Sequence, residues 1–218
     1  MPGRRAELPR KTERRPDSAF DTRPHLGSLQ IGTGHYKNNG DSPRFLPAFI
    51  SDANGIPLGS EVNERYFKLV FLDVGLLTTL LGIRETDLLL EKDIVLIHSG
   101  AVAEQLVGHA LLGGGNPYAE PSLYYWNRPE RGSTAELDYL IQSQGRIIPV
   151  EVKAGSTGRL KSLQTFIQEK GAPVGVRFNS GLPSVCETRT AVAGKEPRPF
   201  TLLSLPLYLA EQLHRLLG

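Results

Sequence analysis

The pattern of hydrophobic and polar positions changes near residue 45. Residues 1–45 are rich in Arg, Pro, Gly, Asp and Asn and show neither the period of two of a strand nor the period of 3.6 of a helix. Such a segment buries too little apolar surface to offset the entropy lost on ordering. We therefore expect a disordered or irregular basic segment over residues 1–45 and a folded domain over residues 46–218.

Within the second part, runs of aromatic and branched residues predict strands, whereas wider apolar spacing predicts helices. The strands are expected over residues 65–72, 122–127, 136–142, 145–155, 172–178 and 200–205. The helices are expected over residues 74–82, 86–94, 99–115, 159–170 and 206–217. This order predicts an α/β fold, a sheet of mixed direction flanked by helices.

Local signals mark several boundaries of these elements. Asp73 stands where its carboxylate can cap the helix over residues 74–82, and Gly82 stands where that helix can end. Ser99 is expected to cap the helix over residues 99–115. The residues Ser143-Gln144-Gly145 predict a tight turn, which joins the strands on either side into an antiparallel hairpin.

That hairpin carries charges inside apolar runs. Alternation along a strand places Glu151 and Lys153 on one face and Val152 on the other. An acid-x-Lys triplet is expected roughly once by chance in a chain of this composition, so the bare motif is weak. Its context strengthens it, because the apolar run before it suggests an inner strand where an unpaired charge would be costly.

The preceding strand shows a similar pattern. Glu136 and Asp138 are expected on one face, with Leu137 and Tyr139 opposite. Two interpretations remain open. Either these charges lie on a solvated face of the hairpin and form surface pairs of little value, or they converge on a metal ion.

The second interpretation assigns a role to each residue. Asp138 and Glu151 would hold Mg²⁺ or Mn²⁺, for which carboxylate oxygens are suitable ligands. Glu104, which borders the apolar stripe of the helix over residues 99–115, would complete the shell. Lys153 would orient a water molecule or stabilise charge on a phosphate.

Composition and charge narrow the cellular setting. The single cysteine excludes an intramolecular disulfide, and the basic start is followed by no apolar signal region, so we expect a cytoplasmic protein without a membrane partner. Residues 1–48 contain nine Lys or Arg and five Asp or Glu, a balance of +4. The remaining residues therefore carry −2, which counts against strong DNA binding by the folded part alone.

The chain from about residue 55 onward resembles the domain of unknown function 4143 of bacteria and archaea, which usually follows an AAA-type ATPase module. The residues that carry the resemblance are GIPLGSEVNERYFKLVFLDVGLL, GAVAEQLVGHAL, LYYWNR, AELDYLI, IIPVEVKAG and LKSLQTF. The order of Glu104, Asp138 and the Glu151-Val152-Lys153 triplet is similar to the PD-(D/E)xK, or restriction-endonuclease-like, superfamily. The resemblance implies a nuclease-like core with Glu104, Asp138, Glu151 and Lys153 as its metal and catalytic set.

The chain departs from that pattern in two respects. It contains no G-x-x-x-x-G-K-[ST] phosphate loop, so we expect no ATP site. Residues 1 to about 45 resemble no part of the family. The leading hypothesis is a Mg²⁺-dependent, nuclease-like domain that hydrolyses phosphodiesters of DNA. The alternative is a module of nuclease fold that binds DNA or protein without cutting it, under the control of a linked or separate AAA-type ATPase.

Overall fold

A computed structural model describes residues 45–82, 94–115, 118–130, 133–155 and 158–218. The expected irregular segment over residues 1–45 lies outside this description except for Phe45, where the first strand begins. The expected helix over residues 86–94 also lies outside it, except for its last residue.

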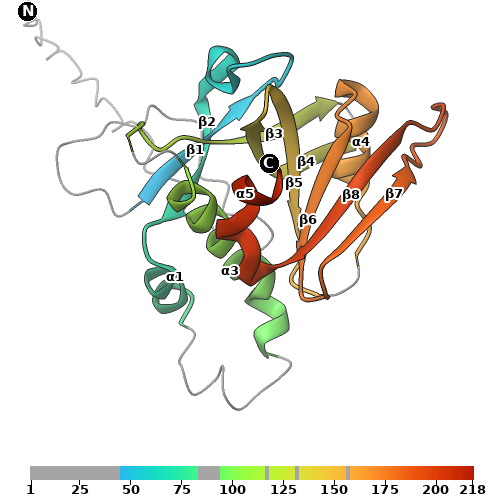
Figure 1. The fold of residues 1–218 in the computed structure, drawn as a ribbon. Helices are drawn as coiled ribbons and strands as arrows, with labels where there is room; N and C mark the ends of the chain where they lie inside the picture. Colours follow the sequence, from blue (N-terminus) through green and yellow to red (C-terminus); the bar gives the residue numbers. More distant parts are fainter. Residues whose placement is uncertain (1–44, 83–93, 116–117, 131–132, 156–157) are drawn as a thin grey trace, which may run out of the picture.

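In the part of the chain that the structure describes, one mixed sheet of eight strands forms the centre, as the pattern predicts for an α/β fold (Figure 1). The strands are β1 (Phe45–Ser51), β2 (Val62–Phe71), β3 (Leu123–Glu130), β4 (Ser133–Ser143), β5 (Arg146–Val152), β6 (Val174–Asn179), β7 (Ser184–Arg189) and β8 (Pro199–Pro206). Their order in the sheet is β2-β1-β3-β4-β5-β6-β8-β7. Neighbours β5, β6 and β8 run parallel, whereas β4 and β5 form the expected antiparallel hairpin.

Helices cover both faces of this sheet. They are η1 (Leu58–Glu61), α1 (Val74–Leu80), α3 (Ile94–Gly113), α4 (Lys161–Lys170), η2 (Leu207–Gln212) and α5 (Leu213–Leu216), where η marks a 3-10 helix. The long helix α3 packs with η2 on one face, and α4 covers β4 and β5 on the other (Figure 1). Two hydrophobic cores result, one under α3 and one under α4. No helix within the described ranges is both long and apolar enough to cross a membrane.

Several local predictions are confirmed. The Asp73 carboxylate accepts a hydrogen bond of 2.6 Å from the backbone N–H of Gly75 and so caps α1. The turn between β4 and β5 consists of Gln144 and Gly145, both with positive φ, as a two-residue hairpin turn requires. A further cap, not among those predictions, is Gly171, which ends α4 in the left-handed conformation.

Other boundaries differ from the predictions. Helix α3 begins at Ile94, so Ser99 lies inside it and is not its cap. The expected closing helix is divided into the 3-10 helix η2 and the short α5. Strands β1 and β7 are additional: β1 contains Pro47, which argues against a strand in sequence, and β7 is an exposed edge strand without an apolar face.

Candidate functional site

A buried lysine connects three elements of the structure. Lys68 Nζ lies 3.0 Å from Glu104 Oε1 on α3 and 2.6 Å from Glu136 Oε1 on β4. Its side chain, 3% exposed, extends from β2 over β1 toward β3, and Nζ lies 5.0 Å from the centre of the Tyr125 ring on β3. The residue paired with Lys68 on β1 is Ala48, whose small side chain leaves room for this path. We call Lys68, Glu104 and Glu136 the Lys68 cluster.

Burial and the neighbouring charges shift the pKa values of Lys68 and Glu104. Burial lowers the pKa of Lys68, but the carboxylates of Glu104, Asp138 and Glu136 outweigh it, so the pKa lies well above its ordinary value. Burial raises the pKa of Glu104 to about 7, although Lys68 partly opposes this rise. The ammonium of Lys68 therefore stays charged at neutral pH, while Glu104 is close to its titration point.

Helix α3 is held against the sheet by specific hydrogen bonds near Glu104. The Tyr139 hydroxyl on β4 donates to the backbone carbonyl of Glu104 at 2.9 Å. The side chain of Gln105 accepts from the backbone N–H of Phe71 and donates to the carbonyl of Leu69, both at 2.8 Å. These contacts fix the turn of α3 that presents Glu104 to the sheet.

Strand β4 contains an irregularity beside Asp138. Its register against β3 shifts by one residue, so Leu137 and Leu140 both pack in the core under α4 while Tyr139 packs in the core under α3. The expected alternation, with Leu137 and Tyr139 on one face, is therefore wrong at Tyr139. A bulge of this kind re-aims a side chain. Here the Asp138 carboxylate accepts a hydrogen bond of 2.6 Å from the backbone N–H of Val152 on β5.

The acid-x-Lys triplet forms an ion pair at the end of β5. Lys153 Nζ lies 2.5 Å from Glu151 Oε1, which agrees with the expectation that the two side chains share a face. Val150 and Val152 pack in the core under α3, so Glu151 lies on the face that α4 covers. Glu151 is 4% exposed, and its second oxygen, Oε2, is buried without a hydrogen-bond partner. We call Asp138, Glu151 and Lys153 the Glu151 cluster.

Burial disfavours the ionised form of both carboxylates in the Glu151 cluster, Asp138 and Glu151. Burial raises the pKa of Asp138 to about 6; Lys68 opposes the rise, and the charge of Glu151 adds to it. Burial also raises the pKa of Glu151, against the attraction of Lys153. Burial lowers the pKa of Lys153, but the Glu151 carboxylate outweighs it, so the pKa lies above its ordinary value.

The two clusters together meet some requirements of a divalent cation. Their four carboxylates and two ammonium groups carry a formal charge of −2, and oxygen atoms are the ligands that Mg²⁺ prefers. The orphaned Oε2 of Glu151 is a buried acceptor that lacks a partner. In donor chemistry and charge, the residues therefore fit such an ion. Within the described ranges, however, no group of three or more His, Cys, Asp and Glu side chains is arranged to hold a metal.

The predicted residues are thus divided between the two clusters. Glu104 pairs with Lys68, while Asp138, Glu151 and Lys153 lie together across β4 and β5, and the charges of the two clusters still influence each other's pKa values. Sequence reasoning missed Lys68 as a member of the site. The available signal was a lysine inside the apolar run YFKLVFL, whose positions 67–71 are all buried in β2.

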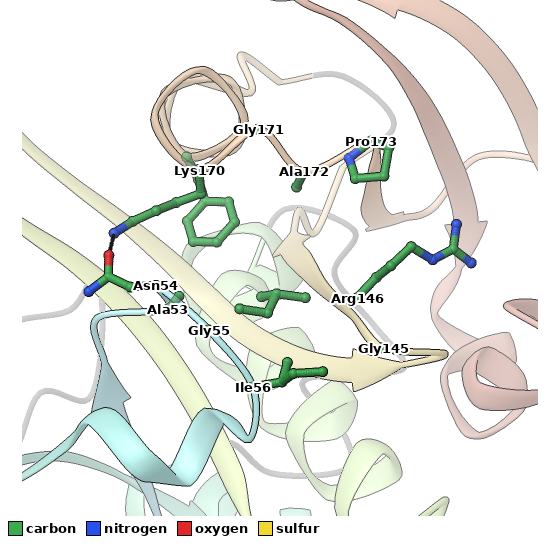
Figure 2. Close-up of a pocket in the computed structure, with 12 residues that line it drawn as sticks. Ala53, Asn54, Gly55, Ile56, Gly145, Arg146, Lys170, Gly171, Ala172 and Pro173 are labelled. Atoms are coloured by element: carbon green, nitrogen blue, oxygen red, sulfur yellow. Dashed lines mark hydrogen bonds between the residues drawn. The ribbon is translucent and has the colours of Figure 1, made fainter.

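The described surface is hollowed at the opposite end of β5. A cavity of about 240 Å³ lies there, and its lining includes the β4–β5 turn and the end of α4 (Figure 2). At its rim, Lys170 Nζ donates to Asn54 Oδ1 at 2.6 Å. Arg146, which lines this cavity, precedes Glu151 by five residues along β5, or about 17 Å at the rise of a strand. The hollow is therefore separate from the charged clusters.

Comparison with known families agrees with part of the expected resemblance. Residues 99–202 match the family model described as domain of unknown function (DUF4143). The match supports a domain of this family from α3 to β8, a range that includes Glu104, Asp138, Glu151 and Lys153 but not Lys68. No curated protein and no solved structure matches the chain.

Proposed function

We propose that this domain is a divalent-cation-dependent, nuclease-like phosphodiesterase of the restriction-endonuclease-like kind, with DNA as its substrate. The observation that carries the proposal is the buried Oε2 of Glu151, which has no partner although Asp138 adds further negative charge beside it. A buried polar atom of this kind costs free energy unless a ligand satisfies it. An Mg²⁺ or Mn²⁺ ion is a ligand that suits a pair of carboxylates.

The roles follow from the positions of the side chains. Asp138, fixed by the Val152 N–H, and Glu151 would hold the cation, and Glu104 would support them from α3. When bound, the cation supplies Lewis-acid chemistry: it polarises a phosphodiester and makes water easier to deprotonate. Lys153, about one third exposed, would release Glu151 to the cation and orient the attacking water.

A second function is favoured by a different observation. Glu104 and Glu151 each already have a lysine partner, at 3.0 Å and 2.5 Å, so both carboxylates are engaged by charges of the chain itself. Carboxylates that are engaged in this way suit a module that binds DNA or protein without cutting it. Such a module would act with a linked or separate AAA-type ATPase.

Calorimetry separates the two functions at the level of the cation. We expect wild-type protein to bind Mg²⁺ and Mn²⁺, and Asp138→Asn to lose this binding, because the amide keeps the size of the carboxylate but lacks its charge. Asp52→Asn is the matched control, since Asp52 is an exposed acid. Absence of cation binding by well-folded wild type would contradict the first proposal and leave the second.

Incubation with plasmid DNA then tests the chemistry. We expect cleavage by the wild type in Mg²⁺ and its loss in Asp138→Asn and Lys153→Met. Lys195→Met, which removes an exposed lysine between β7 and β8, should cleave as the wild type does. Cation binding without cleavage of any DNA or RNA form would favour the non-catalytic module.

A further inference from the structure

A row of polar residues crosses four neighbouring strands, each residue paired with the next. The row consists of Glu151 on β5, Arg177 on β6, Ser204 on β8 and Ser184 on β7. Directly paired residues of neighbouring strands share one face of a sheet. A Cβ atom added at Gly175 would meet side chains of α4, so Arg177, two positions further along β6, also faces the α4 side.

The guanidinium of Arg177 is only partly satisfied. Its Nη2 donates to Ser204 Oγ at 2.9 Å, which turns the group toward β8. Its Nε is buried without an acceptor. Although Arg177 and Glu151 are paired residues, no hydrogen bond or ion pair joins them among the contacts of the described residues, and Glu151 Oε2 is orphaned as well. A buried carboxylate and a half-buried guanidinium thus stand side by side, each with one buried atom that lacks a partner.

We propose that Arg177 binds the phosphate group of the substrate beside Glu151. The identity of the anion rests on the proposed function, whereas the anion site itself rests on Arg177. A guanidinium presents several N–H donors in a planar fork that matches the oxygens of a phosphate, and Ser204 holds this fork in one orientation. A phosphate accepting from Nε, next to a cation at Glu151, would satisfy both orphaned groups together.

The position of Arg177 in the fold agrees with this role. Strands β5, β6 and β8 are parallel, and Glu151, Arg177 and Ser204 lie near their carboxyl ends. Ligands of open α/β sheets bind at this end of the strands. The phosphate would therefore lie at the carboxyl ends of these parallel strands, beside Glu151 and Lys153.

Titration with inorganic phosphate tests the site directly. The Nε–H signal of Arg177 in a ¹H–¹⁵N spectrum of the full chain, assigned by its absence in Arg177→Lys, should shift saturably as phosphate is added. The Nε–H signal of Arg65, exposed on the edge strand β2, serves as the matched control and should not saturate. We expect Arg177→Gln to bind phosphate about tenfold more weakly, the usual range for loss of a charged hydrogen bond.

The outcomes separate this inference from the proposed function. An Arg177 signal that shifts no earlier than that of Arg65 overturns the phosphate site, even if the wild type cleaves DNA. A saturable shift of Arg177 in a protein that cleaves nothing overturns the nuclease proposal and leaves the phosphate site standing. The wild-type titration decides the matter even if Arg177→Gln fails to fold.

Discussion

The Lys68 cluster and the Glu151 cluster both combine carboxylates with a lysine, but they differ in how completely these groups are paired. In the Lys68 cluster a lysine that is 3% exposed lies between two carboxylates, at 3.0 Å and 2.6 Å. In the Glu151 cluster the lysine is about one third exposed, it contacts only one oxygen of Glu151, and the other oxygen is buried without a partner. One cluster is closed by its own contacts, and the other is incomplete.

This difference indicates different roles for similar residues. A buried ion pair adds little net stability, but removing one partner leaves an uncompensated charge and is strongly destabilising. The Lys68 cluster therefore acts as an internal tie between β2, α3 and β4. The Glu151 cluster keeps one acceptor, Oε2 of Glu151, without a partner near the carboxyl ends of the parallel strands. This acceptor lies beside Lys153, whose side chain is about one third exposed.

The largest effect is expected from breaking the closed cluster. Lys68→Met should lower the free energy of unfolding by about 3–5 kcal/mol, because Glu104 and Glu136 lose the cation that compensates them. Urea denaturation at neutral pH measures this change. Lys195→Met provides the control and should change it by less than about 0.5 kcal/mol.

A double variant shows whether the cost comes from the stranded charge. Lys68→Met combined with Glu104→Gln should recover much of the stability lost in Lys68→Met alone, because the amide needs no counter-ion. A double variant as unstable as Lys68→Met would mean that the loss comes from packing against Tyr125 and its neighbours.

Two glycines of α3 test how closely this helix packs against β4, with a smaller expected effect. A Cβ atom at Gly108 would lie 2.8 Å from Cζ of Tyr139, whose hydroxyl binds the Glu104 carbonyl. Gly108→Ala should therefore destabilise the protein by about 1–3 kcal/mol through overpacking. Gly100→Ala, where a Cβ meets nothing within 4 Å, should instead stabilise it by up to about 1 kcal/mol through helix propensity. Thermal unfolding of both variants measures the difference, and equal shifts would contradict the close approach.

The pH dependence of the free energy of unfolding tests whether the pKa values of the buried carboxylates are raised. Glu104 and Asp138 have pKa values of about 7 and about 6 in the folded protein, above their ordinary values of 4.5 and 3.8. At pH values between the ordinary pKa and the folded-state pKa of each group, the folded state binds more protons than the unfolded state. The free energy of unfolding therefore falls as pH rises through this interval. In a chelating buffer the unfolding temperature should decline from about pH 4 to about pH 7.

A divalent cation should reduce that decline. Mg²⁺ or Mn²⁺ bound at Asp138 and Glu151 favours their ionised forms, so its stabilising effect should be largest above pH 7. Thermal scans at several pH values with and without Mg²⁺ measure this. Identical curves under the two conditions would contradict a cation site in the Glu151 cluster.

Much of the fold was predictable from local patterns, and the exceptions have identifiable causes. The Asp73 cap and the Gln144-Gly145 turn depend on nearby residues alone, and both are confirmed. Strand β1 was missed because Pro47 argues against a strand; its pairing with β3 begins only at Ala48. That pairing joins segments distant in sequence, so alternation along the chain does not reveal it.

The site was predictable as a set of residue types and less so as an arrangement. Alternation placed Glu151 and Lys153 on one face, as observed. The bulge in β4 and the reach of Lys68 to Glu104, 36 residues away in sequence, depend on strand order and register. Local patterns do not encode these, so the engagement of Glu104 by Lys68 was not foreseen.

The smallest effect is expected from Asp138, and its sign distinguishes the incomplete cluster from the closed one. Asp138→Asn keeps an acceptor for the Val152 N–H but removes a charge that burial and Glu151 disfavour. In a chelating buffer above pH 7 it should therefore stabilise the protein by about 1 kcal/mol, as expected where a functional residue is held at a cost to stability. In Mg²⁺ the order should reverse, because only the wild type gains stability from the cation. Urea denaturation under both conditions measures the reversal. A variant less stable than the wild type in both buffers would make Asp138 a structural charge of the same kind as Glu104.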